Sequence, residues 1–144
     1  MEPEPLTDLM MREHRRLEEM LENVSLMVNE HPDKVAEAFN TFKWNMEKHL
    51  VIEEKAIFHI EGLSGTELND TFKLMQDHGV IMGLMKKIEQ SIKNKDFSEI
   101  EKLIEILDEH ANFEDQGFYP NLDKKLSADR KKEILERVNE ILKG

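Results

Sequence analysis

Few residues interrupt helix formation in this chain, and their positions divide it into long segments. Its 144 residues include six glycines and four prolines, the residues that break regular structure most strongly. The stretches between them are rich in Glu, Lys, Leu and Met, which favour helix, and none shows the alternating pattern of a strand. The sequence therefore predicts an all-α fold.

Five helices are expected from the spacing of apolar residues and from helix start and stop signals. A turn at His31 and Pro32 and a second between Gly62 and Gly65 separate the first three. Serine or aspartate followed three residues later by glutamate, as in a capping box, opens the third and fourth at Ser64 and Asp96. The expected helices cover about residues 7–29, 32–60, 64–93, 96–116 and 127–143, with Gly117 and Pro120 breaking the fourth.

Short connections between the first four helices require neighbours to be antiparallel. The chain is therefore predicted to form an up-down-up-down four-helix bundle over about residues 6–120, followed by a short C-terminal fifth helix at about 127–143. A single domain of residues 1–144 is expected, because one domain typically needs about 150 residues. The apolar side of the fifth helix could dock on the bundle or on a partner.

Charge and cysteine content exclude several partners and cofactors. Lys plus Arg number 20 against 31 Asp plus Glu, and the net charge of −11 repels phosphate backbones and anionic membranes. The chain has no cysteine, so a metal would be held by nitrogen and oxygen. We find no apolar segment of membrane-spanning length and no signal peptide pattern. We therefore expect no nucleic-acid or membrane partner and a cytoplasmic location.

One histidine lies on the apolar face of each expected bundle helix: His14, His49, His78 and His110. The height of a residue in a bundle follows from its distance to the nearest turn, at about 1.5 Å per residue. By this measure the four fall in one layer to within about one helical turn, whereas His31 and His59 lie at or near turns. A single inward histidine is usually satisfied by a neighbour, but four in one layer need a joint explanation.

Glutamate follows two of these histidines at a spacing of four, in the pairs His49–Glu53 and His110–Glu114. Residues four apart lie one above the other on a helix, so an imidazole and a carboxylate at this spacing can converge on one ion. A shift of 61 residues relates the two pairs, and their surroundings, HLVIEEKAIF and HANFEDQGFY, are partly alike. This repetition strengthens the indication that the two pairs bind metal.

The spacing alone is a weak indication, because glutamate is common in this chain. The 22 glutamates would give six histidines about one such pair by chance, and there are three. The third is His14 with Glu18, and the spacing does not exclude Glu18 as a ligand. We expect Glu18 instead to form a salt bridge at the rim of the first helix.

Four imidazoles and two carboxylates in a two-fold arrangement suit two metal ions bridged by the carboxylates. Each buried polar group without a partner would cost about 2 kcal/mol if no metal were present. The donors suit non-haem iron best, with manganese or zinc as alternatives. A di-metal class with Glu-x-x-His on two helices does not fit, because Met or Leu stands three positions before each of the four histidines.

The order H, HxxxE, H, HxxxE resembles the hemerythrin-like, or HHE cation-binding, family over nearly the whole chain. The resemblance implies a non-haem di-iron centre with an oxo or hydroxo bridge. His14 and His49 would bind one iron, and His78 and His110 the other. Both carboxylates would bridge, which gives the implied ligand set His14, His49, Glu53, His78, His110 and Glu114.

The chain departs from the oxygen carriers that it resembles. Those proteins have two histidines four apart on the third helix, where this chain has only His78. Their last bridge is an aspartate five positions after its histidine, whereas here Glu114 stands at the fourth position and Asp115 at the fifth. With one ligand fewer, exchangeable sites suit sensing or redox chemistry at least as well as oxygen transport.

The sequence favours a di-iron protein that binds or senses dioxygen or a related small molecule such as nitric oxide. The alternative is a di-iron enzyme that reduces peroxide or nitric oxide, or oxidises ferrous iron. A third interpretation is a metal-free structural bundle with a buried polar network. No catalytic residue and no protein partner can be assigned from the sequence.

Overall fold

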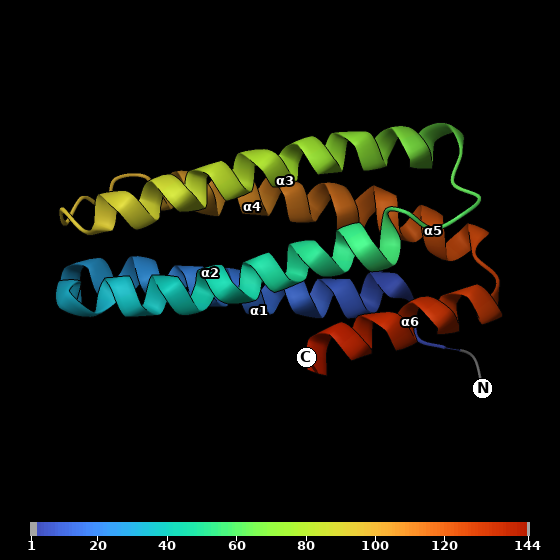
Figure 1. Cartoon of the computed structure of the whole chain (residues 1–144), viewed down its shortest axis with the longest axis horizontal. Helices are drawn as coiled ribbons and strands as arrows, with labels where there is room; N and C mark the ends of the chain where they lie inside the picture. Colours follow the sequence, from blue (N-terminus) through green and yellow to red (C-terminus); the bar gives the residue numbers. More distant parts are fainter. Residues whose placement is uncertain (1–2, 144) are drawn as a thin grey trace.

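The computed structural model describes residues 3–143, and every regular element in that range is helical. Its four long helices are α1 (Leu6–Glu30), α2 (Val35–Ile52), α3 (Gly65–Ile92) and α4 (Ile100–Phe113) (Figure 1). A 3-10 turn, η1 (Pro32–Lys34), joins the first two. Neighbouring helices are antiparallel, and α1 also contacts α4, which closes the bundle. The predicted all-α, up-down-up-down bundle is confirmed.

Two clusters of buried apolar side chains fill the bundle, one on each side of the histidine layer. One includes Leu21, Phe39 and Ile88, and the other includes Met10 and Phe118. Burial of one such side chain contributes about 1.5–3 kcal/mol. The stability of the bundle therefore comes mainly from these clusters, which hold the polar layer between them.

A π-helical segment follows each of the two helices that carry His49 and His110. The segment η2 (Glu53–Ile57) continues α2, and η3 (Glu114–Phe118) continues α4. In η2 the Phe58 amide donates to the Glu53 carbonyl at 2.8 Å, a bond that spans five residues. Such segments are rare and often occur at functional sites. Both begin at a predicted ligand, within the repeated sequence.

The fourth helix does not end where the sequence predicted. Helical structure continues through η3 into α5 (Tyr119–Lys125), so neither Gly117 nor Pro120 breaks it. Pro120 lies in the first turn of α5, where helices tolerate a residue without an amide hydrogen. The bundle therefore extends to about residue 125, and α2 ends at Ile52 before η2 replaces it.

Neither predicted capping box forms. Ser64 precedes α3 but caps it with no side-chain hydrogen bond, and Glu67 instead accepts a bond of 2.7 Å from Lys125. Asp96 accepts bonds from the amide and hydroxyl of Ser98 in the turn before α4, which begins later than predicted. Lys125 is distant from Glu67 in the sequence, so the local sequence around Ser64 does not reveal this contact.

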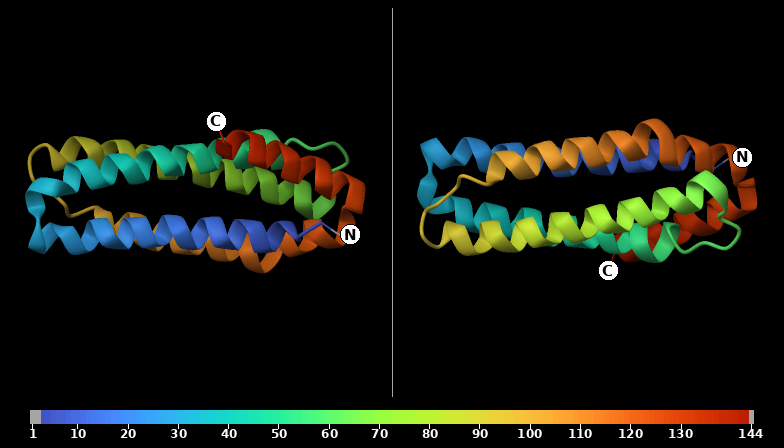
Figure 2. Two further views of the ribbon diagram at one scale, coloured as in Figure 1. Left: turned by 90° about the horizontal axis from the view of Figure 1, so that it is seen from below. Right: turned by 90° about the horizontal axis from the view of Figure 1, so that it is seen from above.

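The C-terminal helix α6 (Ala128–Lys143) folds back and packs on α2 and η2 (Figure 2). Ser127 accepts a bond from the Arg130 amide at its start, Val138 is fully buried, and Lys48 donates to the Leu142 carbonyl at 2.7 Å. The apolar side of this helix is therefore covered by its own bundle. No helix within residues 3–143 has both the length and the apolar character of a bilayer-spanning segment.

Candidate metal centre

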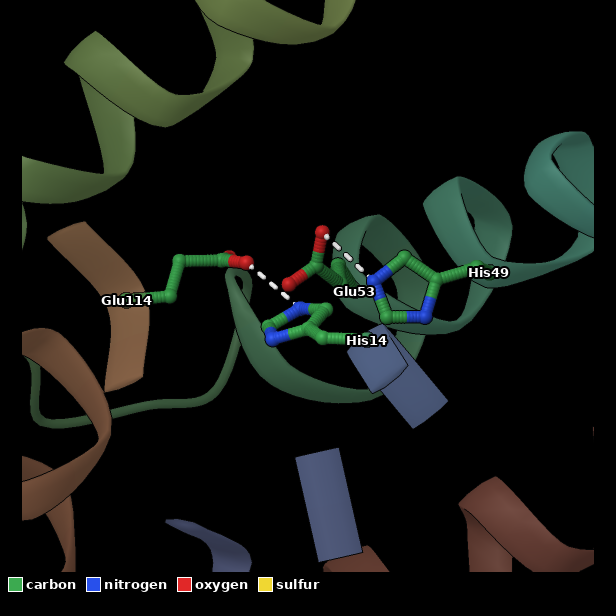
Figure 3. A group of neighbouring side chains, drawn as sticks. All are labelled: His14, His49, Glu53 and Glu114. Carbon is green, nitrogen blue, oxygen red and sulfur yellow. Dashed lines mark ion pairs between the residues drawn. The ribbon is translucent and has the colours of Figure 1, made fainter. Parts of the chain in front are cut away.

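The four histidines predicted to share a layer meet in the middle of the bundle, one from each long helix. Each exposes at most 5% of its surface, and both Glu53 and Glu114 are fully buried. Figure 3 shows four of these side chains, His14, His49, Glu53 and Glu114, pointing toward one another. The structure thus brings together all six predicted residues, whereas His31 and His59 are exposed.

Glu53 lies between the imidazoles. Its Oε1 is 3.0 Å from Nε2 of His78 and 3.4 Å from Nε2 of His49. The same oxygen is 3.6 Å from Nε2 of His110. The other oxygen, Oε2, accepts a hydrogen bond of 2.5 Å from the Tyr119 hydroxyl. One carboxylate therefore approaches three helices besides its own.

Glu114 completes the group from the opposite hairpin. Its Oε1 is 3.0 Å from Nε2 of His14 and 3.3 Å from Nε2 of His110. Two sets of four ligand atoms result, each with all its atoms within 4.8 Å of one another. One set contains His14 and His49, the other contains His78 and His110, and both contain the two glutamates. This arrangement can hold two cations that share both carboxylates.

The donor atoms fit a metal better than a network of hydrogen bonds. Among the described residues, no hydrogen-bond partner is found for Nε2 of His14, His49 or His110 or for either oxygen of Glu114. Of the short distances above, only those from Glu53 to His78 and to Tyr119 are hydrogen bonds, and the others join atoms that converge on one region. A buried polar atom without a partner costs about 1–3 kcal/mol, and coordination would satisfy all five atoms.

Acidic residues hold the outer nitrogens of two imidazoles. Nδ1 of His14 lies 2.9 Å from Asp115, and Nδ1 of His110 lies 3.3 Å from Asp77. A carboxylate at Nδ1 fixes the ring orientation and leaves Nε2 to bind a metal. The sequence analysis assigned neither aspartate this role, although Asp115 directly follows a predicted ligand in the repeated segment.

A similar but longer contact, without a hydrogen bond, occurs in the other hairpin. Glu54 directly follows Glu53, as Asp115 follows Glu114, and Glu54 lies 3.6 Å from Nδ1 of His78. Each hairpin therefore places an acidic residue beside the first histidine of the other hairpin. The adjacent acidic pairs in the two repeats were the only sequence signal for these contacts.

Protons occupy two of the imidazoles, those of His14 and His110, when no metal is bound. Burial lowers the pKa of His14, but Asp115 and Glu114 outweigh burial and raise it to about 10. Burial is likewise outweighed at His110, where Glu114 and other carboxylates raise the pKa to about 12. Burial would raise the pKa of Glu53, yet His49 and its other neighbours hold it well below the usual value. Metal binding must therefore release protons.

Glu18 lies at the rim of this layer and is half-buried, but its predicted salt bridge is wrong. Within residues 3–143 no basic side chain lies within ion-pairing distance of it. Partial burial and the nearby Asp108 raise the pKa of its carboxyl. The charged residue that faces it from α4 is therefore acidic, where a salt bridge would need a lysine or arginine.

Comparison with known protein families identifies the family of the chain. The model of the Hemerythrin HHE cation binding domain matches residues 6–122, a range that includes all six. The chain belongs to this family. Neither the curated proteins nor the solved structures compared with it gave a match. The matched range of this HHE domain covers the bundle and most of α5 and leaves α6 outside.

The family binds cations, and this HHE domain has two groups of histidine and glutamate that could hold them. All of the donors in these groups are nitrogen or oxygen, which borderline and hard divalent metals accept. Their assignment as the ligands of this chain remains a prediction, and it is developed below.

Replacing Asp115 with alanine is expected to weaken metal binding by this HHE domain about 10–100-fold. The His14 ring would lose the partner that orients it, while Nε2 would stay in place to bind more weakly. Competition with a coloured chelator measures the affinity. Asp115→Asn, which keeps an acceptor oxygen, should retain more of it, and Glu109→Ala on the exposed side of α4 should have no effect. Unchanged affinity in Asp115→Ala would contradict the role assigned to Asp115.

Proposed function

We propose that this HHE domain is a non-haem di-iron protein that binds or senses dioxygen or a related small molecule such as nitric oxide. The observation that carries the proposal is the donor set, in which four imidazoles and two carboxylates form two groups that share both carboxylates. Nitrogen and oxygen donors without sulfur suit iron, and they are also compatible with manganese or zinc. The cytoplasmic location predicted from the sequence belongs to the same proposal.

In the proposed centre Glu53 and Glu114 would each help to hold both ions, because both belong to each group of donor atoms. His14 and His49 would hold one ion, and His78 and His110 would hold the other. Each ion would then have four protein donors, which leaves positions open on both ions for an exogenous ligand. When bound, iron would supply the affinity for such a ligand and the ability to exchange electrons with it.

A small cavity beside the centre supports the proposal that the ligand is a small molecule. It measures about 10 Å³ and is lined by His14 and His110 together with side chains that include Leu17, Met46 and Leu107. A space of this size is near the lower limit for one water molecule. Its walls are mostly apolar, with Glu18 at the edge as the only further titratable group. These features favour binding of a diatomic molecule over acid–base chemistry on a larger substrate.

A di-iron redox enzyme that reduces peroxide or nitric oxide, or oxidises ferrous iron, is a second candidate. Tyr119 favours it, because this buried phenol donates to Glu53 at 2.5 Å and places a proton donor at the centre. Burial and the two glutamates raise the pKa of Tyr119 well above its usual value, so the phenol keeps its proton. Continued consumption of peroxide or nitric oxide would identify this function.

Titration of the reduced, iron-loaded protein with dioxygen or nitric oxide tests the leading proposal. We expect the visible spectrum to change with saturating stoichiometry and to return when the gas is removed and the protein is reduced again. Multiple turnovers would assign the enzyme function instead. A loaded protein whose spectrum responds to neither gas would contradict the proposal.

A further inference from the structure

A groove of about 320 Å³ lies between α1 and α4 and adjoins the small cavity beside the centre. Four carboxylates line it: Glu18, Glu22, Glu105 and Asp108. Its remaining lining residues are Leu21, Ile104 and Leu107, so no basic side chain lines it. None of the four carboxylates forms an ion pair with a basic residue within residues 3–143. The groove is therefore an uncompensated concentration of negative charge.

The groove and the small cavity beside the centre share part of their walls. Glu18 and Leu107 line both, so these two side chains separate the outer groove from His14 and His110. Leu107 is buried and Glu18 is half-buried. Since Glu18 follows His14 by four residues, its carboxylate lies about one turn farther along the same helical face.

Two histidines of the adjoining small cavity have ring nitrogens without partners, which is a separate reason to expect a cation to enter from the groove. His14 and His110 are each at least 95% buried, and neither Nε2 has a hydrogen-bond partner among the described residues. These histidines line the inner cavity, so a cation that passed Glu18 would meet two imidazole nitrogens without hydrogen-bond partners, and its binding would displace their protons. By contrast, the Phe58 ring covers His78, with ring centroids 5.3 Å apart.

We propose that this groove is the route by which divalent metal cations reach the centre, with Glu18 transferring them from the acidic rim to His14 and His110. The proposal rests on the proposed function, because it supplies metal to that centre. Clustered charge of one sign raises the local concentration of oppositely charged ions and speeds their association by about 10-fold or more. The transfer involves no redox step: the cation would exchange the Glu18 carboxylate for Nε2 of His14 and His110, and these two imidazoles would release their protons to solvent.

The test compares rates of metal uptake by the metal-free chain, followed by stopped-flow absorbance with Co²⁺ and with anaerobic Fe²⁺. The rim variant is Glu22→Gln/Glu105→Gln/Asp108→Asn, all three exposed positions. The matched control is Glu133→Gln/Glu136→Gln/Glu140→Gln on the exposed side of α6, which removes the same charge away from the groove. We expect uptake by the rim variant to slow about 10-fold and the control to keep nearly the wild-type rate.

Salt and Glu18 provide two further readouts. The difference between rim variant and control should shrink as ionic strength rises, because salt screens exposed charges. Glu18→Gln should also slow uptake while leaving the final number of bound ions unchanged. A Glu18→Gln protein that binds fewer ions at saturation would make Glu18 a ligand and overturn its role in transfer.

The proposed metal route and the proposed metal centre can be disproved independently. Rim variant and control loading at the same rate, with full final occupancy in both, would overturn the route and leave the centre intact. A wild-type chain that never fills with Co²⁺ or Fe²⁺ would overturn the centre and the route with it.

Discussion

Chelation of metal from the loaded protein is expected to lower its melting temperature by about 10 °C. A ligand present at 100 times its dissociation constant stabilises the folded state by about 2.7 kcal/mol. For a chain of this length each kcal/mol corresponds to about 3–4 °C. The physical source is the set of five buried atoms that metal would satisfy: Nε2 of His14, His49 and His110 and the two oxygens of Glu114.

Thermal unfolding followed by circular dichroism, with and without chelator, measures this shift. Readdition of ferrous iron should restore the higher melting temperature. In Glu53→Ala, which we expect to hold little metal, chelator should change the melting temperature much less. Identical melting temperatures of the loaded and chelated wild-type proteins would show that the polar layer is satisfied without metal. That result would support the alternative of a metal-free structural bundle.

Replacement of Glu53 or Glu114 by alanine is expected to remove most of the bound iron. Each belongs to both groups of donor atoms, so its loss would take one donor from each ion at once. The affinity should fall by more than the roughly 10–100-fold that follows loss of an outer partner. Metal analysis after loading and desalting measures the remaining iron.

Matched variants separate a lost ligand from a damaged fold. His31→Ala and His59→Ala remove exposed histidines and should leave the iron content unchanged. Glu53→Gln keeps the size of the side chain and an oxygen that can accept from Tyr119, so a folded Glu53→Gln protein with low iron would isolate the role of the charge. Equal loss of iron in all of the variants would contradict the single-layer arrangement.

The sequence was sufficient to predict the four-helix bundle and to predict that the six residues lie close together in it. Apolar periodicity fixed the inward face of each helix, and short connections fixed the antiparallel order, so heights could be compared along the chain. Helix boundaries were less predictable. Gly117 and Pro120 are weak helix formers, yet tertiary packing carries the helix through both of them.

The side chains that form hydrogen bonds with the predicted ligands could not be predicted from residue spacing. Asp77 meets His110 from another helix, and Tyr119 meets Glu53 across the bundle. Such contacts depend on the rotation of each helix, and the π-helical segments alter that rotation just after Glu53 and Glu114. No propensity scale marks a π turn, and it is the structure that shows one in each copy of the repeated sequence.

Metal analysis of the purified wild-type chain, combined with its visible spectrum before and after exposure of the reduced protein to air, tests the central claim most directly. We expect about two irons per chain, as in other carboxylate-bridged bundle centres, and an absorption band that appears in air. A colourless chain that retains no stoichiometric metal, even after anaerobic loading with ferrous iron, would contradict the account.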